Sequence, residues 1–185
     1  WMMQGRLALA EGRAAEAEQN LVRAAECFGT ARDDTAAQGV ALLRAEAARL
    51  AGDFVRARSH AESALAAFEA RGARDSQARA WIELALVFVA ARDEAARRMA
   101  LARAHAVVAD LPHAAVRVQL DAIDMASTVG EQLVARGMCT AAEAARLVQE
   151  ALSSGHSMGT VLRRAGVCDA RAFADFLDAA LQIPS

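Results

Sequence analysis

The sequence predicts an all-α protein, and three observations lead to this class. Alanine, the strongest helix former, is the commonest residue. Only two prolines, Pro112 and Pro184, are present among the 185 residues to break helices. No segment alternates apolar and polar residues over the length of a strand, because the short run VFVA at 87–90 lies within a helical pattern.

A first internal repeat covers residues 1–120 at an interval of 40 residues. Equivalent positions hold Trp1, Ala41 and Trp81, then Gly12, Gly52 and Arg92, and further on Phe28, Phe68 and Val108. Each copy predicts a first helix of about eleven residues, a tight turn and a second helix. The remaining residues of each period are expected in polar links at 29–39 and 69–79.

The clearest copy, AGDFVRARSHAESALAAFEARG, shows how the turn is encoded. Gly52 is expected to end the first helix in the left-handed conformation, and Asp53 to begin the second near its positive end. The third copy has Arg92 where this glycine is expected. One face of the second helix is predicted to be lined by small residues and closed by a phenylalanine: Ala57, Ala61, Ala64 and Phe68.

These features resemble tetratricopeptide repeats over about residues 1–110, with a longer period than that family usually has. The resemblance implies an α-α superhelical repeat array whose first helices line a concave groove for a peptide or partner helix. Polar residues of the first helices are the groove candidates: Gln4, Arg44, Glu46 and Glu83. The alternatives are that these side chains are only solvated, and that the chain is an unrelated antiparallel helical array. A further helix, HAAVRVQLDAIDMAST, is expected to cap the array and complete a domain at 1–127.

A second repeat, of 29 residues, occupies 128–185. Gly130, Leu133, Gly137 and Cys139 recur as Gly159, Leu162, Gly166 and Cys168. The pattern predicts a small helical domain of two helix-turn-helix units that bury each other's apolar faces. Gly137 and Gly166 are each expected to stop a short helix with positive φ. Thr140 with Glu143 forms a predicted capping box, and Asp169 is the predicted N-cap of the second copy.

This doubled pattern resembles the N-terminal (MshEN) domain of type II secretion and type IV pilus assembly ATPases, whose motif is R-L-G-x-x-L-x-x-x-G-x6-L-x3-L-x2-Q. The resemblance implies docking of a partner protein or, in other members, binding of cyclic di-GMP. The leading arginine is replaced by Thr128 and Ser157, and the closing glutamine by Ala151 and Ala180, which removes the expected phosphate contacts. Candidate nucleotide contacts under the second implication are Gly130, Leu133, Ser157, Met158, Gly159, Leu162, Arg163, Arg164 and Gly166.

Composition argues against several other classes. The net charge is −2, and all 21 basic residues are arginines without a dense cluster, as expected for a GC-rich bacterial genome and not for a nucleic-acid-binding face. A DNA-binding helix-turn-helix, weakly suggested by TAAEAARLVQEAL, lacks basic flanks. The four histidines and three cysteines have no metal-ligand spacing, and no catalytic motif is present. No apolar run is long enough to span a membrane.

The sequence therefore predicts a non-catalytic bacterial protein-interaction or scaffold module in the cytoplasm, without a cofactor. Because the chain opens in mid-helix at Trp1, we expect it to be part of a larger signalling, secretion or motility protein. Cyclic di-GMP sensing by residues 128–185 is the alternative function. A repeat array cut at one end exposes an apolar face, so homo-oligomers are a further expectation.

Overall fold

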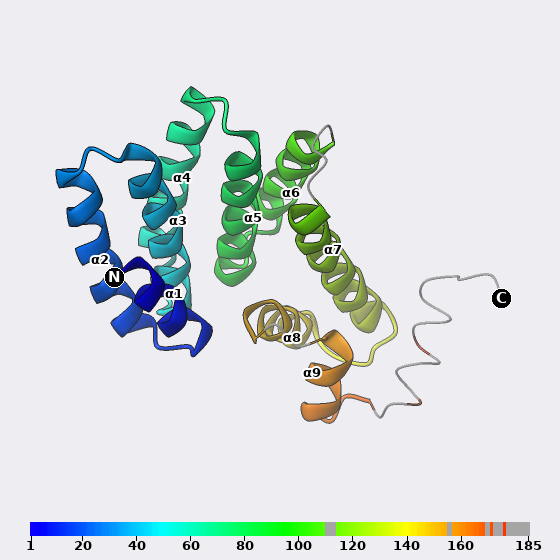
Figure 1. Ribbon diagram of the computed structural model, residues 1–185. Helices are drawn as coiled ribbons and strands as arrows, with labels where there is room; N and C mark the ends of the chain where they lie inside the picture. The colour runs from blue at the N-terminus through cyan, green and yellow to red at the C-terminus, as the bar shows by residue number, and fades with distance from the viewer. Residues whose placement is uncertain (110–113, 155–156, 169–170, 172–175, 177–185) are drawn as a thin grey trace. The chain divides into compact units, whose positions relative to one another are not determined.

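The computed structural model describes residues 1–109, 114–154, 157–168, 171 and 176 (Figure 1), and these residues form helices and no strand. The helices are α1 (Met2–Ala10), α2 (Ala14–Thr30), α3 (Asp34–Leu50), α4 (Phe54–Ala70), α5 (Arg74–Ala91), α6 (Glu94–Val108), α7 (Ala114–Ala135), α8 (Ala141–Ser154) and α9 (Met158–Arg164). The predicted all-α class is thereby confirmed for the described part of the chain. None of its helices is long and apolar enough to cross a membrane.

Two compact units make up the chain: unit 1 is Trp1–Leu120 and unit 2 is Asp121–Ser185. The boundary between them falls inside α7, whereas the sequence places the domain boundary later in the same helix, after residue 127. Each unit has its own hydrophobic core, and each is described separately below.

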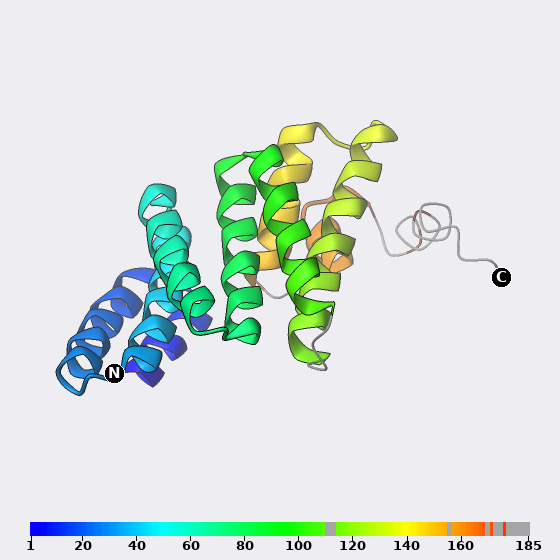
Figure 2. The ribbon, with the colours of Figure 1, turned by 90° about the horizontal axis from the view of Figure 1, so that it is seen from above.

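The helices of unit 1 follow one another at a constant interval. Helices α2 to α6 begin at Ala14, Asp34, Phe54, Arg74 and Glu94, so each helix starts 20 residues after the previous one. Two consecutive helices therefore account for the 40-residue period. Consecutive helices run in opposite directions and pack together (Figure 2), and α3 also contacts α1 and α5. The first helices of successive pairs therefore lie side by side.

The turn at Gly52 shows what ends each helix. Gly52 has φ +82°, and its N–H donates to Arg49 O at 3.0 Å while Asp53 N–H donates to Ala48 O at 2.9 Å. This pair of bonds is a Schellman motif, which satisfies the last carbonyls of a helix. The same two bonds recur after α1, α2, α4, α5, α7 and α9. Gly52, Gly137 and Gly166 thus lie outside helices with positive φ, as the sequence predicts.

The residue that completes this turn also starts the next helix. The Asp53 carboxylate accepts a hydrogen bond from Arg56 N–H at 3.0 Å, and Asp33 and Asp93 cap α3 and α6 in the same way. A side-chain acceptor at this position satisfies an N–H group that has no partner within the helix. A residue with positive φ followed by aspartate therefore marks both the end of one helix and the beginning of the next.

The long polar links expected at 29–39 and 69–79 are wrong. Helix α3 begins at Asp34 and α5 at Arg74, so only residues 31–33 and 71–73 connect the helices on either side. The remaining link residues form the last residues of α2 and α4 and the first turns of α3 and α5. Their polarity reflects exposure of those turns to solvent and does not indicate a loop. The first helices are therefore longer than the sequence predicts, with 17 residues in α3 and 18 in α5.

Arg92 stands at the position of Gly52 and adopts the same left-handed backbone, with φ 59°. A side chain with Cβ in this conformation costs about 1–2 kcal/mol, part of which is offset because glycine makes the unfolded chain more flexible. We therefore expect Arg92→Gly to raise the free energy of unfolding by about 1 kcal/mol in urea titrations. Ala51→Gly is the matched control, because Ala51 is exposed and right-handed (φ −79°) and should lose stability. A loss with Arg92→Gly would contradict the strain argument.

Small residues fill the interior of unit 1, as predicted from its clearest copy. The second helix α4 buries Ala57, Ala61 and Ala64 completely, and Phe68 is 4% exposed. Alanine at these positions lets neighbouring helices approach closely, while the larger core residues Leu21 and Val40 pack between α1, α2 and α3. The superhelical, tetratricopeptide-like form of this unit stays a prediction.

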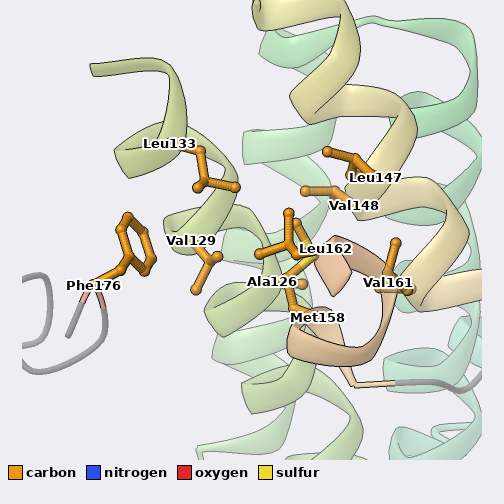
Figure 3. Packing of buried hydrophobic residues seen from close by; sticks show 10 residues of the cluster. Ala126, Val129, Leu133, Leu147, Val148, Met158, Val161, Leu162 and Phe176 are labelled. Carbon is orange, nitrogen blue, oxygen red and sulfur yellow. The ribbon is translucent and has the colours of Figure 1, made fainter. Parts of the chain in front are cut away.

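Unit 2 is built around one apolar cluster from α7, α8 and α9 (Figure 3). Val129 and Leu133 on α7 face Val148 on α8 and Leu162 on α9. The backbone of α7 comes close to α8 at Gly130, where an added Cβ would lie 2.8 Å from Cγ2 of Val148. Since the valine side chain is stiff, this position needs glycine for packing.

The capping box predicted for unit 2 is present, whereas the other predicted helix ends have mixed outcomes. Thr140 N–H donates to the Glu143 carboxylate at 2.8 Å, and Glu143 N–H donates to Thr140 Oγ1 at 3.3 Å, which is the predicted capping box. Asp169 lies outside the described residues. The expectation of a short helix before each glycine is correct for Gly166, which follows α9. It is wrong for Gly137, which follows the 22-residue α7, because no helix-breaking residue interrupts the pattern upstream of Gly130.

Candidate functional site

The four residues predicted for the groove of unit 1 lie on first helices, but the structure brings only two of them together. Glu46 on α3 and Glu83 on α5 both lie close enough to Arg49 to interact with it electrostatically. Gln4 is exposed on α1. Arg44 belongs to a different cluster, described below. The candidate site of unit 1 is therefore the group Glu46, Arg49 and Glu83, which we call the α3–α5 charge cluster.

A buried ion pair forms the centre of the α3–α5 charge cluster. Arg49 Nε donates to Glu83 Oε1 at 2.7 Å, and Arg49 Nη2 lies 3.5 Å from Oε2. Both residues are only 8% exposed. Sequence reasoning missed Arg49. The one signal was its register, because the equivalent position 40 residues earlier holds the apolar Leu9.

Glu46 lies half-buried beside this ion pair and is not part of it. No described residue donates a hydrogen bond to its carboxylate. Burial raises the pKa of Glu46, although the positive charges of Arg49 and, on α1, Arg6 act in the opposite direction. A half-buried carboxylate without a hydrogen-bond donor is unfavourable, since its solvation is only partly replaced.

The same competition acts on Glu83. Burial raises the pKa of Glu83 to about 7, against the lowering effect of Arg49 and with a further contribution from the negative charge of Glu46. One guanidinium thus faces two carboxylates in a poorly solvated place. The cluster can gain a proton near neutral pH, because burial of Glu83 outweighs the attraction of Arg49 and the charge of Glu46 adds to the effect.

We expect this raised pKa to make the protein less stable as pH rises. The folded chain holds a proton on Glu83 at pH values where the unfolded chain, with the ordinary pKa of 4.5, has lost it. The stabilisation is complete below pH 4.5 and is lost as pH rises through about 7. Its size is on the order of 3 kcal/mol.

The measurement compares the wild type with Glu83→Gln, which mimics the protonated acid, in urea titrations from acidic to mildly alkaline pH. The wild type should lose stability relative to the variant as pH rises. Other titrating groups are shared by the two proteins and cancel in the difference, except for Glu46, whose titration is coupled to Glu83. A wild type that gains stability relative to the variant would show that Arg49 keeps Glu83 ionised in the folded state.

Arg44 takes part in a separate ion cluster between α2, α3 and α4. Arg44 Nη2 donates to Glu18 Oε1 at 2.8 Å, and Arg56 Nη2 donates to the same oxygen at 2.6 Å. These hydrogen bonds connect α2, in the first helix pair, to α3 and α4, which form the second pair. Arg44 therefore has a structural partner, which sequence reasoning could not see because Glu18 lies one helix earlier.

Most residues of the doubled motif in unit 2 have roles in packing, helix capping or turns. Leu133 and Leu162 are fully buried and Met158 is 8% exposed, all in the apolar cluster of Figure 3. The Ser157 hydroxyl accepts a hydrogen bond from Thr160 N–H at 3.3 Å and caps α9. Gly130 contacts Val148, as described above. Gly159 lies in the first turn of α9, and Gly166 forms the turn after it.

The two candidate arginines of the motif face solvent. Arg163 and Arg164 are exposed in the last turn of α9. The guanidinium of Arg136 lies over the ring of Phe176, 5.0 Å from its centroid. Of the nine residues predicted as nucleotide contacts, only these two arginines combine positive charge with exposure.

The cysteines of unit 2 pack like small apolar residues. Cys139 and Cys168 occupy equivalent positions and lie half-buried against the apolar cluster. Burial, with a smaller contribution from Glu143, raises the pKa of Cys139, so its reactive thiolate form is disfavoured. Within the described residues no group of three or more potential ligands could hold a metal ion.

No protein-family model, curated protein or solved structure matches this chain. The resemblances to tetratricopeptide repeats and to the MshEN domain therefore remain predictions from the sequence.

Proposed function

We propose that this protein is a non-catalytic protein-interaction module, and that the first helices α1, α3 and α5 bind a peptide or helix of a partner protein. Support comes from the way α3 contacts both α1 and α5, which gives the three helices a common side. A continuous line of charged groups crosses these helices in the order Arg6, Glu46, Arg49 and Glu83. Charged groups held in fixed positions favour one partner over others more than they add affinity.

The observation that carries the proposal is the partly satisfied α3–α5 charge cluster. A chain selected only for stability would favour leucines here, as found at the equivalent Leu9 and Leu43 of the preceding pair. Perturbed charges kept at a cost to stability are more frequent at functional sites than elsewhere. The glycines and leucines of unit 2 have packing roles, so cyclic-dinucleotide sensing does not form part of the proposal.

The test selects binders for the full chain from a library of random twelve-residue peptides and then maps where they bind. Selected peptides carrying a photo-reactive group should cross-link to residues 2–10, 34–50 and 74–91. Scrambled versions of the same peptides serve as controls. Cross-links confined to α2, α4 and α6, or a library that yields no binder, would contradict the proposed function.

A further inference from the structure

We propose that the partner places a cationic side chain, lysine or arginine, against Glu46, so that the binding face of α1, α3 and α5 recognises a basic peptide segment. This inference rests on the proposed function and deepens it. It follows from a count of charges and hydrogen bonds in the α3–α5 charge cluster.

The first step is the imbalance of this cluster. Arg49 donates its shortest hydrogen bond, 2.7 Å, to Glu83. Glu46 is left half-buried without a hydrogen bond from any described residue. Arg6 on α1 interacts with it electrostatically but is itself exposed, where solvent weakens the attraction. The cluster thus has one carboxylate in excess.

The second step is that the fold does not require an acid at this position. In the 40-residue register, Glu46 corresponds to Arg6 in the preceding first helix and to Leu86 in the following one. The equivalent position therefore holds a basic residue in one of the other two helix pairs and an apolar residue in the other. The carboxylate of Glu46 is therefore specific to the second helix pair, α3 and α4, and the stacking of the helices does not require it.

The third step is the chemistry of the ligand. A primary ammonium or a guanidinium supplies both the positive charge and the N–H donors that Glu46 lacks. Charge-assisted hydrogen bonds of this kind are short and strong, and they are stronger in a partly desolvated place than on an open surface. An acidic or purely apolar segment would leave the carboxylate without solvent and without a partner, which disfavours such ligands.

The experiment uses the full chain and the twelve-residue peptides selected above. Binders that cross-link to α1, α3 and α5 should be enriched in lysine or arginine. Glu46→Gln should weaken them about tenfold or more. Glu69→Gln, an exposed acid on the second helix α4, should leave their affinity unchanged. Equal thermal midpoints of Glu46→Gln and the wild type would show that the fold is intact.

A double-mutant cycle decides whether the contact is direct. Replacing the basic residue of a peptide with norleucine or citrulline should weaken binding to the wild type, yet cause little further loss with Glu46→Gln. Binding to the wild type should also weaken as pH falls, because burial raises the pKa of Glu46 and protonation removes its charge. The charged groups facing Glu46 are Arg6, Arg49 and Glu83. Burial also raises the pKa of Glu83 to about 7, so Glu83→Gln separates the contribution of that group.

The outcomes distinguish the two proposals. Peptides that bind this face without a basic residue, or with losses that simply add in the cycle, would overturn the inference and leave the proposed function standing. A library without any binder to the face would overturn both.

Discussion

Replacing Arg49 with leucine is expected to lower the free energy of unfolding of unit 1 by about 3–5 kcal/mol. The substitution leaves the buried carboxyl group of Glu83 without the guanidinium that donates to it at 2.7 Å. Protonation of Glu83 limits the loss but does not remove it, because a buried carboxylic acid still needs hydrogen-bond partners. Tryptophan fluorescence in urea titrations measures the change, since both tryptophans, Trp1 and Trp81, lie in unit 1.

The double variant with Arg49→Leu and Glu83→Leu should recover this loss and reach or exceed the stability of the wild type. The chain already has leucines at the equivalent positions one repeat earlier. These residues, Leu9 and Leu43, belong to one apolar cluster. Replacing both members of a buried ion pair with packed apolar residues is often neutral or stabilising. A double variant as unstable as the single one would show that the space around Arg49 cannot accept leucine side chains.

Leu162→Ala is expected to cost unit 2 about 2–5 kcal/mol. Leu162 is fully buried between α7 and α8, and truncating it leaves a cavity in the apolar cluster of this small unit. Because a core of this size supplies only about 3–5 kcal/mol, most of unit 2 should unfold. Far-ultraviolet circular dichroism measures the loss of helix, while tryptophan fluorescence, which reports on unit 1 alone, serves as the internal reference.

Two further variants make this prediction specific. Leu133→Ala removes the equivalent leucine of the other copy, also fully buried, and should cost about as much. Leu152→Ala is the matched control on α8, since this leucine is only partly buried against the same cluster and should cost less. A negligible effect of Leu162→Ala would contradict the structural role of the motif leucines.

Signals confined to a few consecutive residues could be predicted well from the sequence. Gly52 with Asp53 specifies a turn and a cap through bonds that span only six residues, 48–53, and one more to Arg56. Thr140 and Glu143 specify a capping box within four residues. The alanine face of α4 follows from helical spacing alone. In each case the physical cause lies within one or two helical turns.

Features that depend on packing between helices could not be predicted in the same way. Arg49 looks like a solvated arginine in the sequence, and its burial against Glu83 depends on how α3 and α5 meet. Arg44 was predicted for the groove, but its bond to Glu18 on α2 gives it another role. The polar beginnings of α3 and α5 resemble loops in composition, although an aspartate cap at Asp33 starts a helix there.

The turns that join α1 through to α6 leave no spare residue between helices. Asp53 is at once the last residue of one turn and the cap of the following helix, and the same holds for Asp33 and Asp93. One residue inserted within a helix would rotate the rest of that helix by about 100°, which would carry its interior alanines away from the core. Gain or loss of a whole helix pair keeps the 40-residue register of the remaining helices, whereas an insertion within one helix breaks the match between its buried face and the neighbouring helices.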